Sequence, residues 1–176
     1  MSITPYLKHT ALSICAMALA VMPLFAQQNN TKKTLVAYFS ATGTTRQAAE
    51  KLARQHNAVL WEIEAAEPYT AADLDWRNKQ SRSSLEMQDE EARPTIKQCT
   101  NILPYDTIYV GYPIWLGICP RIINSWIDNN LEQLESKVLI PFATSGSSDI
   151  KQSVGYLRKT YPTLKWEKGM QMNKYS

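Results

Sequence analysis

The sequence is poor in the residues on which most metal sites and hydrolytic sites depend. It has two histidines and three cysteines among 176 residues, and His9 and Cys15 lie in an apolar N-terminal stretch. After that stretch only His56 is left, so a histidine-based metal site or a Ser-His-Asp triad has almost nothing to build on. Cys99 and Cys119 lack the C-x-x-C spacing of a redox dithiol. We predict two unpaired thiols, with a disulfide as the alternative, and neither a metal site nor a catalytic side chain.

Common nucleotide-binding motifs are also missing. No Gly-Lys-Ser/Thr sequence ends a P-loop, which argues against a triphosphate with magnesium. No G-x-G-x-x-G is present, which argues against a dinucleotide. The formal net charge of +3 comes without a basic stripe interleaved with aromatic residues, so nucleic acid is not an expected partner. The same mild positive charge argues against the very acidic surface of many small electron carriers.

The N-terminus lacks charge over a long stretch, because charged residues are absent from Thr10 to Thr31. An apolar run from Ala11 to Ala26 falls short of the about 20 residues that span a bilayer. We therefore predict a signal peptide over residues 1–26, leaving residues 27–176 as one domain that is periplasmic or secreted, with no membrane span after cleavage. Leu24 stands where a small residue is preferred, so an uncleaved membrane anchor is the alternative.

The most informative stretch is the turn after the first apolar run. Leu35–Phe39 has the pattern of a strand buried on both faces, and a helical pattern begins at Thr45. The free N–H groups and the dipole of a helix N-terminus favour an anion, so this turn is a candidate phosphate site. A polar loop that caps a helix and binds nothing is the alternative. The predicted contacts in this turn are Ser40, Thr42, Gly43, Thr44 and Thr45.

Strands and helices alternate along the chain, which indicates an α/β fold with a parallel sheet covered on both faces. Pro141 cannot donate to a ladder, so we expect its strand to end or bend there. In the polar stretch 64–104 we expect short helices rather than one long loop. The expected strands are 33–39, 58–63, 105–112, 138–142 and 166–172, and the expected helices are 45–55, 71–77, 84–92, 120–131 and 150–158.

Three strand ends carry loops that should meet at one edge of the sheet, where ligands of such folds bind. Trp115 lies between a proline and a glycine in the second loop, and its indole is suited to cover a flat ring; packing in the core is the alternative. Ser147 or Ser148 should cap the helix that follows the third loop. The predicted contacts in these two loops are Pro113, Ile114, Trp115, Gly117, Ser145, Gly146 and Ser147.

Taken together, these segments resemble the flavodoxin family. The matching stretches are Ser-Ala-Thr-Gly from Ser40, Gly-Tyr-Pro-Ile-Trp from Gly111 and Thr-Ser-Gly-Ser-Ser from Thr144. The resemblance implies a flavodoxin-like three-layer sandwich, a parallel five-stranded sheet of order 2-1-3-4-5 and non-covalently bound FMN. It also implies a peptide flip at Gly117 near the flavin N5 and polar contacts to the ring edge from the third loop.

The chain departs from the family at its end. Family members normally finish with an amphipathic helix, whereas Lys174–Ser176 end this sequence. We therefore expect the final helix to be missing and one sheet face beside the last strand to be left uncovered.

The resemblance implies an FMN-binding electron-transfer protein. The predicted signal peptide makes it an exported one, which is a second departure from the family. Its partner would be a redox protein or a small-molecule electron acceptor. One alternative is an NAD(P)H-dependent FMN reductase acting on quinones or similar acceptors, with a second pocket built by residues 64–104, which include Tyr69, Trp76 and Arg77. Another alternative is a flavodoxin-fold binding protein that has lost FMN.

Overall fold

The protein is described by a computed structural model that covers Met1 and residues 33–172. The predicted signal peptide after Met1 and residues 173–176 lie outside the described residues. The sheet has parallel strands in the order β2-β1-β3-β4-β5, as predicted. Its main strands are β1 (Thr34–Tyr38), β2 (Val59–Glu62), β3 (Thr107–Pro113) and β4 (Val138–Thr144).

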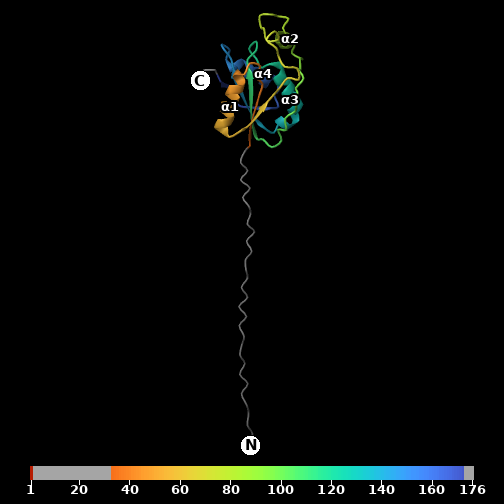
Figure 1. The fold of residues 1–176 in the computed structure, drawn as a ribbon. Helices are drawn as coiled ribbons and strands as arrows, with labels where there is room; N and C mark the ends of the chain where they lie inside the picture. Colours follow the sequence, from red (N-terminus) through yellow and green to blue (C-terminus); the bar gives the residue numbers. More distant parts are fainter. Residues whose placement is uncertain (2–32, 173–176) are drawn as a thin grey trace. The chain divides into compact units, whose positions relative to one another are not determined.

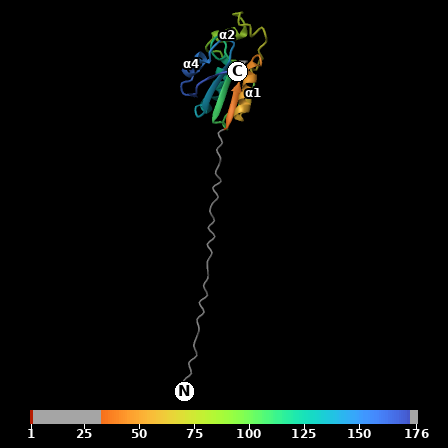
Figure 2. The ribbon, with the colours of Figure 1, turned by 90° about the vertical axis from the view of Figure 1, so that its left-hand side faces the viewer.

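Helices cover both faces of this sheet, so the three layers are confirmed. Figures 1 and 2 show α1 on one side and α3 and α4 on the other. Because side chains alternate along a strand, Val36 and Tyr38 pack with α1, whereas Leu35 and Ala37 pack in the larger core on the opposite face. The helices are α1 (Thr44–His56), α2 (Arg82–Gln88), α3 (Arg121–Leu134) and α4 (Ile150–Thr160). Within the described part of the chain, no helix is long and apolar enough to cross a membrane.

The buried stripe of α3 differs from the prediction at one position. Ile122, Ile123, Trp126 and Ile127 are buried as expected, but Leu131 is 36% exposed. At about 100° per residue, Leu131 lies on the flank of the stripe. Asn130 is buried instead, and its Nδ2 donates to the carbonyl oxygen of Trp126 at 2.8 Å. A polar residue thus takes a core position because its own helix satisfies its amide.

The predicted helix over 71–77 is wrong. Thr70 donates from its N–H and its hydroxyl to the Asp73 carboxylate at 2.8 and 2.7 Å, and the Asp73 N–H donates back to Thr70 Oγ1 at 3.2 Å. The Arg77 N–H then donates to Asp75 Oδ1 at 3.2 Å. Such local side-chain bonds compete with the helical ladder, so this stretch forms turns.

The second short helix is present but shifted from the predicted 84–92. α2 begins at Arg82, because Ser81 caps it with a side chain that accepts from the N–H of Ser84 at 3.3 Å. It ends before Asp89, whose carboxylate accepts from the N–H of Glu91 at 2.9 Å. The charged run 89–91 therefore turns away from the helix rather than extending it.

Pro141 does not end its strand, which corrects the prediction. β4 continues to Thr144, and Pro141 pairs in register with Val110 of β3. The Leu139 carbonyl accepts from Glu167 and the Ala143 carbonyl accepts from Met172, so odd-numbered residues of β4 face the outer edge. The backbone nitrogen of Pro141, which has no N–H, therefore faces the outer edge. It lies opposite the gap between β5 (Lys165–Trp166) and β6 (Met170–Gln171), where no ladder bond is required.

The predicted last strand is interrupted, and β5 and β6 pair with different parts of β4. Up to residue 172, no helix follows β6. The face beside α1 is nevertheless closed where it can be described, which corrects the expected bare surface. Tyr109 is 7% exposed and Phe142 is fully buried, and Met170 and Met172 pack against their cluster. The end of the chain thus supplies part of the apolar cover itself.

Candidate cofactor site

The three predicted loops meet at the carboxyl ends of β1, β3 and β4. Together they form one side of a cavity of about 460 Å³. Three segments far apart in the sequence therefore contribute to one site, as the parallel topology requires. The predicted residues that line the cavity are Thr42, Pro113, Ile114, Trp115, Ser145, Gly146 and Ser147. Ser40, Gly43, Thr44, Thr45 and Gly117 are not among the lining residues.

A second wall of the cavity comes from the long segment between β2 and β3. Leu74 and Trp76 lie in its turns, and Ser83, Ser84 and Met87 lie on α2. Of these, only Trp76 was predicted from the sequence as a possible pocket residue. The length of the segment was a signal that it builds something, but no motif in it indicates which side chains face the cavity. The remaining lining residues are Ala41, Leu116 and Ser148.

The turn before α1 is organised by Ser40. Its Oγ accepts from the N–H groups of Gly43 at 3.1 Å and of Arg46 at 3.2 Å. Gly43, at φ 85°, is the N-cap residue and has no side chain to cap α1, so Ser40 takes only the N–H of Arg46 in the first turn. A residue with a Cβ would be strained at that φ. The first-turn amides of Thr44 and Thr45 are not used by this serine, and free amides at a helix N-terminus favour an anion.

Thr45 points away from this turn. Its Oγ1 lies 2.7 Å from Thr144 Oγ1, and the two residues are 1% and 5% exposed. The hydroxyl therefore links the start of α1 to the end of β4 inside the molecule. Thr42 is exposed and lines the cavity, and Thr44 is half-buried. In the predicted phosphate turn, Thr45 thus has a structural role inside the molecule, whereas Thr42 faces the cavity.

The Trp115 loop is a tight turn of two central residues. The N–H of Trp115 donates to the carbonyl of Ile118 at 2.9 Å, and the reverse bond measures 3.1 Å. Leu116 and Gly117 both have positive φ, at 47° and 89°. The left-handed region suits Gly117 but strains Leu116, whose side chain is 64% exposed at the cavity.

The Trp115 indole has both of the roles considered for it. It lines the cavity and packs against the larger core. Its ring meets Phe39 edge-on with centroids 5.6 Å apart and Tyr69 with centroids 5.4 Å apart. Such edge-to-face contacts fix the orientation of an aromatic ring. The indole is therefore held in place before any ligand arrives.

The Ser145 loop is organised like the Ser40 turn, by a serine hydroxyl that accepts from two backbone N–H groups. Ser145 Oγ accepts from the N–H groups of Ser147 at 3.2 Å and of Ser148 at 2.8 Å. The predicted cap by Ser147 or Ser148 is wrong, because Asp149 caps α4 by accepting from the N–H of Lys151 at 2.8 Å. A carboxylate suits that position better, since it also interacts with the helix dipole. The serines are left facing the cavity.

No charged side chain is among the described residues that line the cavity. Arg46, close in sequence to the turn, is held elsewhere by the Glu62 carboxylate at 2.6 and 2.7 Å. Hydrogen bonding to Glu62 raises the pKa of Arg46. Tyr38 donates to Glu62 at 3.2 Å, and burial is the main reason that its pKa is raised. The cavity therefore offers neutral donors.

The second wall is joined to the core by an ion pair on α2 and a tyrosine that is hydrogen-bonded to it. Arg82 contacts Glu86 at 2.7 Å on α2, and the Tyr69 hydroxyl donates to the same carboxylate at 2.6 Å. The Arg82 guanidinium lies 4.2 Å from the centroid of the Tyr69 ring. Burial, and then the hydrogen bond to Glu86, raise the pKa of Tyr69 far above its usual range. Since Tyr69 also contacts Trp115, the two walls are connected through packed side chains.

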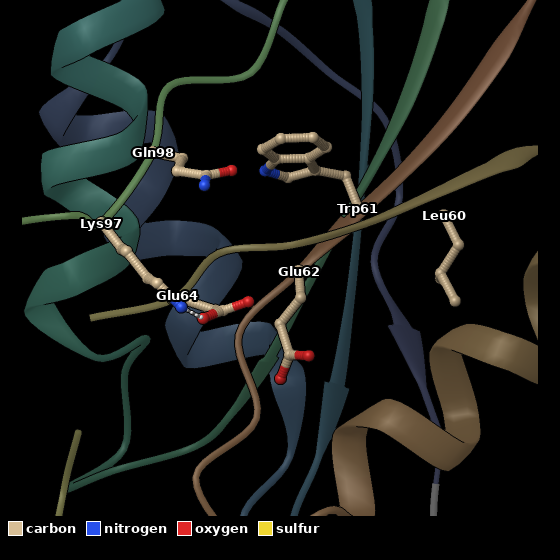
Figure 3. Close-up of a pocket in the computed structure, with 6 residues that line it drawn as sticks. All are labelled: Leu60, Trp61, Glu62, Glu64, Lys97 and Gln98. Atoms are coloured by element: carbon tan, nitrogen blue, oxygen red, sulfur yellow. Dashed lines mark hydrogen bonds and ion pairs between the residues drawn. The ribbon is translucent and has the colours of Figure 1, made fainter. Parts of the chain in front are cut away.

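A second, smaller cavity of about 170 Å³ lies beside the edge strand β2 (Figure 3). Lys97 and Glu64 form an ion pair of 2.9 Å across it, and the Trp61 indole N–H is buried without a partner among the described residues. Figure 3 shows Trp61 directed toward Gln98, while Glu62 points to another side. No predicted site residue lines this cavity, so we do not assign it to the cofactor.

The two cysteines after residue 26 are both free, as predicted. Cys99 is exposed and Cys119 is fully buried. Burial raises the pKa of the Cys119 thiol to about 12. Neither residue lines the cavity.

The sequence family agrees with this geometry. A family model described as Flavodoxin matches residues 33–176. The chain belongs to the flavodoxin family. No curated protein matches it.

Solved structures extend the comparison. A protein of Bacteroides eggerthii DSM 20697, provisionally classed as a flavoprotein, is 52% identical with a TM-score of 0.77, covering 80% of this chain and 87% of its own. A second such protein, from Bacteroides uniformis ATCC 8492, is 48% identical with a TM-score of 0.77, and the match covers 82% of this chain and 92% of that protein. A flavoprotein of Lactobacillus acidophilus NCFM, solved in complex with FMN, is 24% identical with a TM-score of 0.63, and the match covers 80% of this chain and 93% of that protein. This last likeness shows the shared fold.

Proposed function

We propose that this flavodoxin-family protein binds FMN without a covalent bond and transfers electrons outside the cytoplasm. The cavity at the carboxyl ends of β1, β3 and β4 carries the proposal. Its volume of about 460 Å³ lies within the range of small-molecule sites. Its lining has neutral hydroxyls and a fixed indole, and the N-terminus of α1 follows directly after the lining residue Thr42. These groups are suited to a polar ring edge, a flat ring and a phosphate.

The residues divide among the parts of the cofactor. The backbone of Gly43 and Thr44, with the Thr42 hydroxyl, would hold the phosphate. Ile114 and Trp115 would contact the ring, and the loop from Ser145 to Ser147 would face its polar edge. Bound FMN supplies one- and two-electron chemistry, while the protein supplies binding and electrostatics. Because the donors are neutral, the phosphate charge of about −1.5 to −2 stays uncompensated and disfavours further negative charge on the ring.

No side chain is assigned a catalytic role, since simple electron transfer requires no acid or base. The electrons pass to or from a redox protein or a small molecule. Export rests on the sequence, namely on the uncharged stretch from Thr10 to Thr31. Sequencing the N-terminus of protein recovered from the cell exterior or periplasm tests it, and a chain that retains residues 1–26 in the membrane contradicts cleavage.

A visible absorption spectrum tests cofactor binding. Residues 27–176 are purified and titrated with FMN, with absorbance and flavin fluorescence recorded together. We expect a perturbed flavin spectrum, quenched fluorescence and saturation at one FMN per chain. A free-flavin spectrum throughout the titration would contradict the proposal and favour a binding protein without FMN. Oxidation of NAD(P)H by the loaded protein alone would favour the reductase alternative.

A further inference from the structure

The second wall of the cavity depends on a helix that is too short to be stable alone. α2 has 7 residues, Arg82–Gln88, and it lies inside the long segment between β2 and β3. An isolated helix of fewer than about 12 residues is marginal in water, so contacts with the rest of the molecule must fix its position. Ser83, Ser84 and Met87 of this helix line the cavity. The groups that hold α2 therefore also shape the cavity.

Arg121, the first residue of α3, binds the end of this helix. Its guanidinium donates to the carbonyl oxygens of Glu86 at 3.4 Å and of Met87 at 3.3 Å. A cation at a helix C-terminus interacts favourably with the last carbonyls and with the helix dipole. A third bond, of 2.6 Å, runs from the same guanidinium to the Tyr156 hydroxyl on α4. One side chain thus connects α2 to two helices that cover the sheet.

Arg121 is buried without a carboxylate partner. It is 2% exposed, and it takes part in no ion pair within the described part of the chain. A buried charge costs folding free energy unless other groups compensate it, and here two backbone carbonyls and a hydroxyl do so. Arg121 is not among the residues that line the cavity. Its contacts therefore point to a role that acts through α2.

The place of Arg121 in the chain also ties it to the wall formed by the three loops. The Trp115 turn closes through backbone bonds of 2.9 and 3.1 Å with Ile118, and the chain then passes through the fully buried Cys119 into α3. The turn and the start of α3 are thus one firmly packed piece. Because Arg121 fixes α2 to that piece, the spacing between Trp115 and Met87 depends on it.

We propose that Arg121 is a positioning residue of the cofactor site, which keeps the second wall in place beside bound FMN and slows release of the cofactor. The inference rests on the proposed function, since FMN is the ligand that the wall retains. Without the guanidinium, the Glu86 and Met87 carbonyls lose their donor, and α2 moves away from the cavity more often. FMN then dissociates faster, whereas its association, which requires an open wall, is not slowed.

Three variants of residues 27–176 are compared with the parent. Arg121→Met removes the guanidinium and keeps an unbranched side chain. Arg121→Lys keeps the charge but replaces the planar fork by a single ammonium, which cannot serve α2 and Tyr156 in the same geometry. Tyr161→Phe is the matched control, because Tyr161 is 6% exposed and its hydroxyl bonds to two residues of α3 and to none of α2.

Two kinds of measurement separate cofactor retention from the hold on α2. Stopped-flow fluorescence follows FMN association with the cofactor-free protein, and recovery of flavin fluorescence after large dilution follows dissociation. Hydrogen exchange of the cofactor-free protein, read by mass spectrometry over residues 82–88, follows the opening of α2. Urea unfolding of each variant records its overall stability.

We expect FMN to dissociate about tenfold faster from Arg121→Met, the scale of one lost hydrogen bond to a charged group, with association within about twofold of the parent. The α2 amides should exchange about tenfold faster in the same variant without FMN. Arg121→Lys should change both rates less and in the same direction, and it carries the test if Arg121→Met does not fold. Tyr161→Phe should lose stability in urea and keep the parent's dissociation and exchange rates.

Three results would overturn the inference. Unchanged FMN dissociation from folded Arg121 variants would show that the residue serves only the stability of the fold. An equal increase in Tyr161→Phe would show general loosening rather than a hold on α2. Slower association with unchanged dissociation would show that Arg121 shapes the entrance. Failure of the proposed function is distinguishable, because the parent then binds no FMN, while exchange over residues 82–88 still tests whether Arg121 holds α2.

Discussion

The buried pair of threonines allows a sharp test of which hydroxyls serve structure and which serve binding. Thr45 Oγ1 and Thr144 Oγ1 lie 2.7 Å apart, and both residues are at most 5% exposed. Replacing Thr45 by valine keeps the shape and leaves the Thr144 hydroxyl without this partner. An unsatisfied buried group costs about 1–3 kcal/mol, so each single variant should lose that much stability.

The double variant should recover most of the loss. When both hydroxyls become methyl groups, no polar group is left unpaired, and such replacements are nearly neutral. We therefore expect Thr45→Val with Thr144→Val to be more stable than the sum of the two single changes, with a coupling of about 1–3 kcal/mol.

Equilibrium unfolding in urea measures this cycle. Residues 27–176 are studied without cofactor, so that ligand binding does not add to stability, and tryptophan fluorescence reports the transition. Additive single effects in the double variant would refute the coupling and with it the inward role of Thr45. A further check is FMN affinity, which the folded Thr45→Val protein should retain because its hydroxyl does not face the cavity.

Two other changes test the site, and a thiol titration tests the burial of the cysteines. Thr42→Val should weaken FMN binding by about 1–3 kcal/mol in a fluorescence titration, because Thr42 faces the cavity; an unchanged affinity would remove its hydroxyl from the phosphate site. Trp115→Ala should restore flavin fluorescence and shift the flavin potential in a redox titration. If the fluorescence and the potential both stay the same, the indole serves only the core. For the thiols, one group per chain of residues 27–176 should react with Ellman's reagent at pH 8 in the folded protein and two in denaturant. Cys99 is exposed, whereas burial raises the pKa of Cys119 to about 12 and keeps its thiol protonated; two fast-reacting thiols would contradict that burial.

The sequence predicted those parts of the fold that depend on local patterns. Apolar runs separated by helical periodicity indicate the parallel sheet, and the turns after β1, β3 and β4 must then share an edge. Ser40 and Ser145 were predicted as ligand contacts, yet each accepts two backbone N–H groups of its own loop. Position in the fold was thus predictable, whereas the partner of each hydroxyl was not.

What could not be predicted depends on contacts between distant segments. Thr45 meets Thr144 across 99 positions, and no local pattern indicates that contact. Pro141 is tolerated because the outer neighbour of β4 is interrupted opposite it, which only the assembled sheet shows. In the stretch after β2, the mutual bonds of Thr70 and Asp73 prevail over a weak helical pattern.

The two serine-organised loops have a consequence for how the protein matures. Ser40 and Ser145 hold their loops in shape with hydrogen bonds from the chain itself, and Phe39 and Tyr69 orient the Trp115 ring. Such a site does not need its ligand in order to form, so the entropy of ordering it is spent during folding rather than on binding. Folding and cofactor uptake are then separable in time and in place. The export that we propose would then let the chain cross a membrane empty, fold on the far side and acquire its cofactor there.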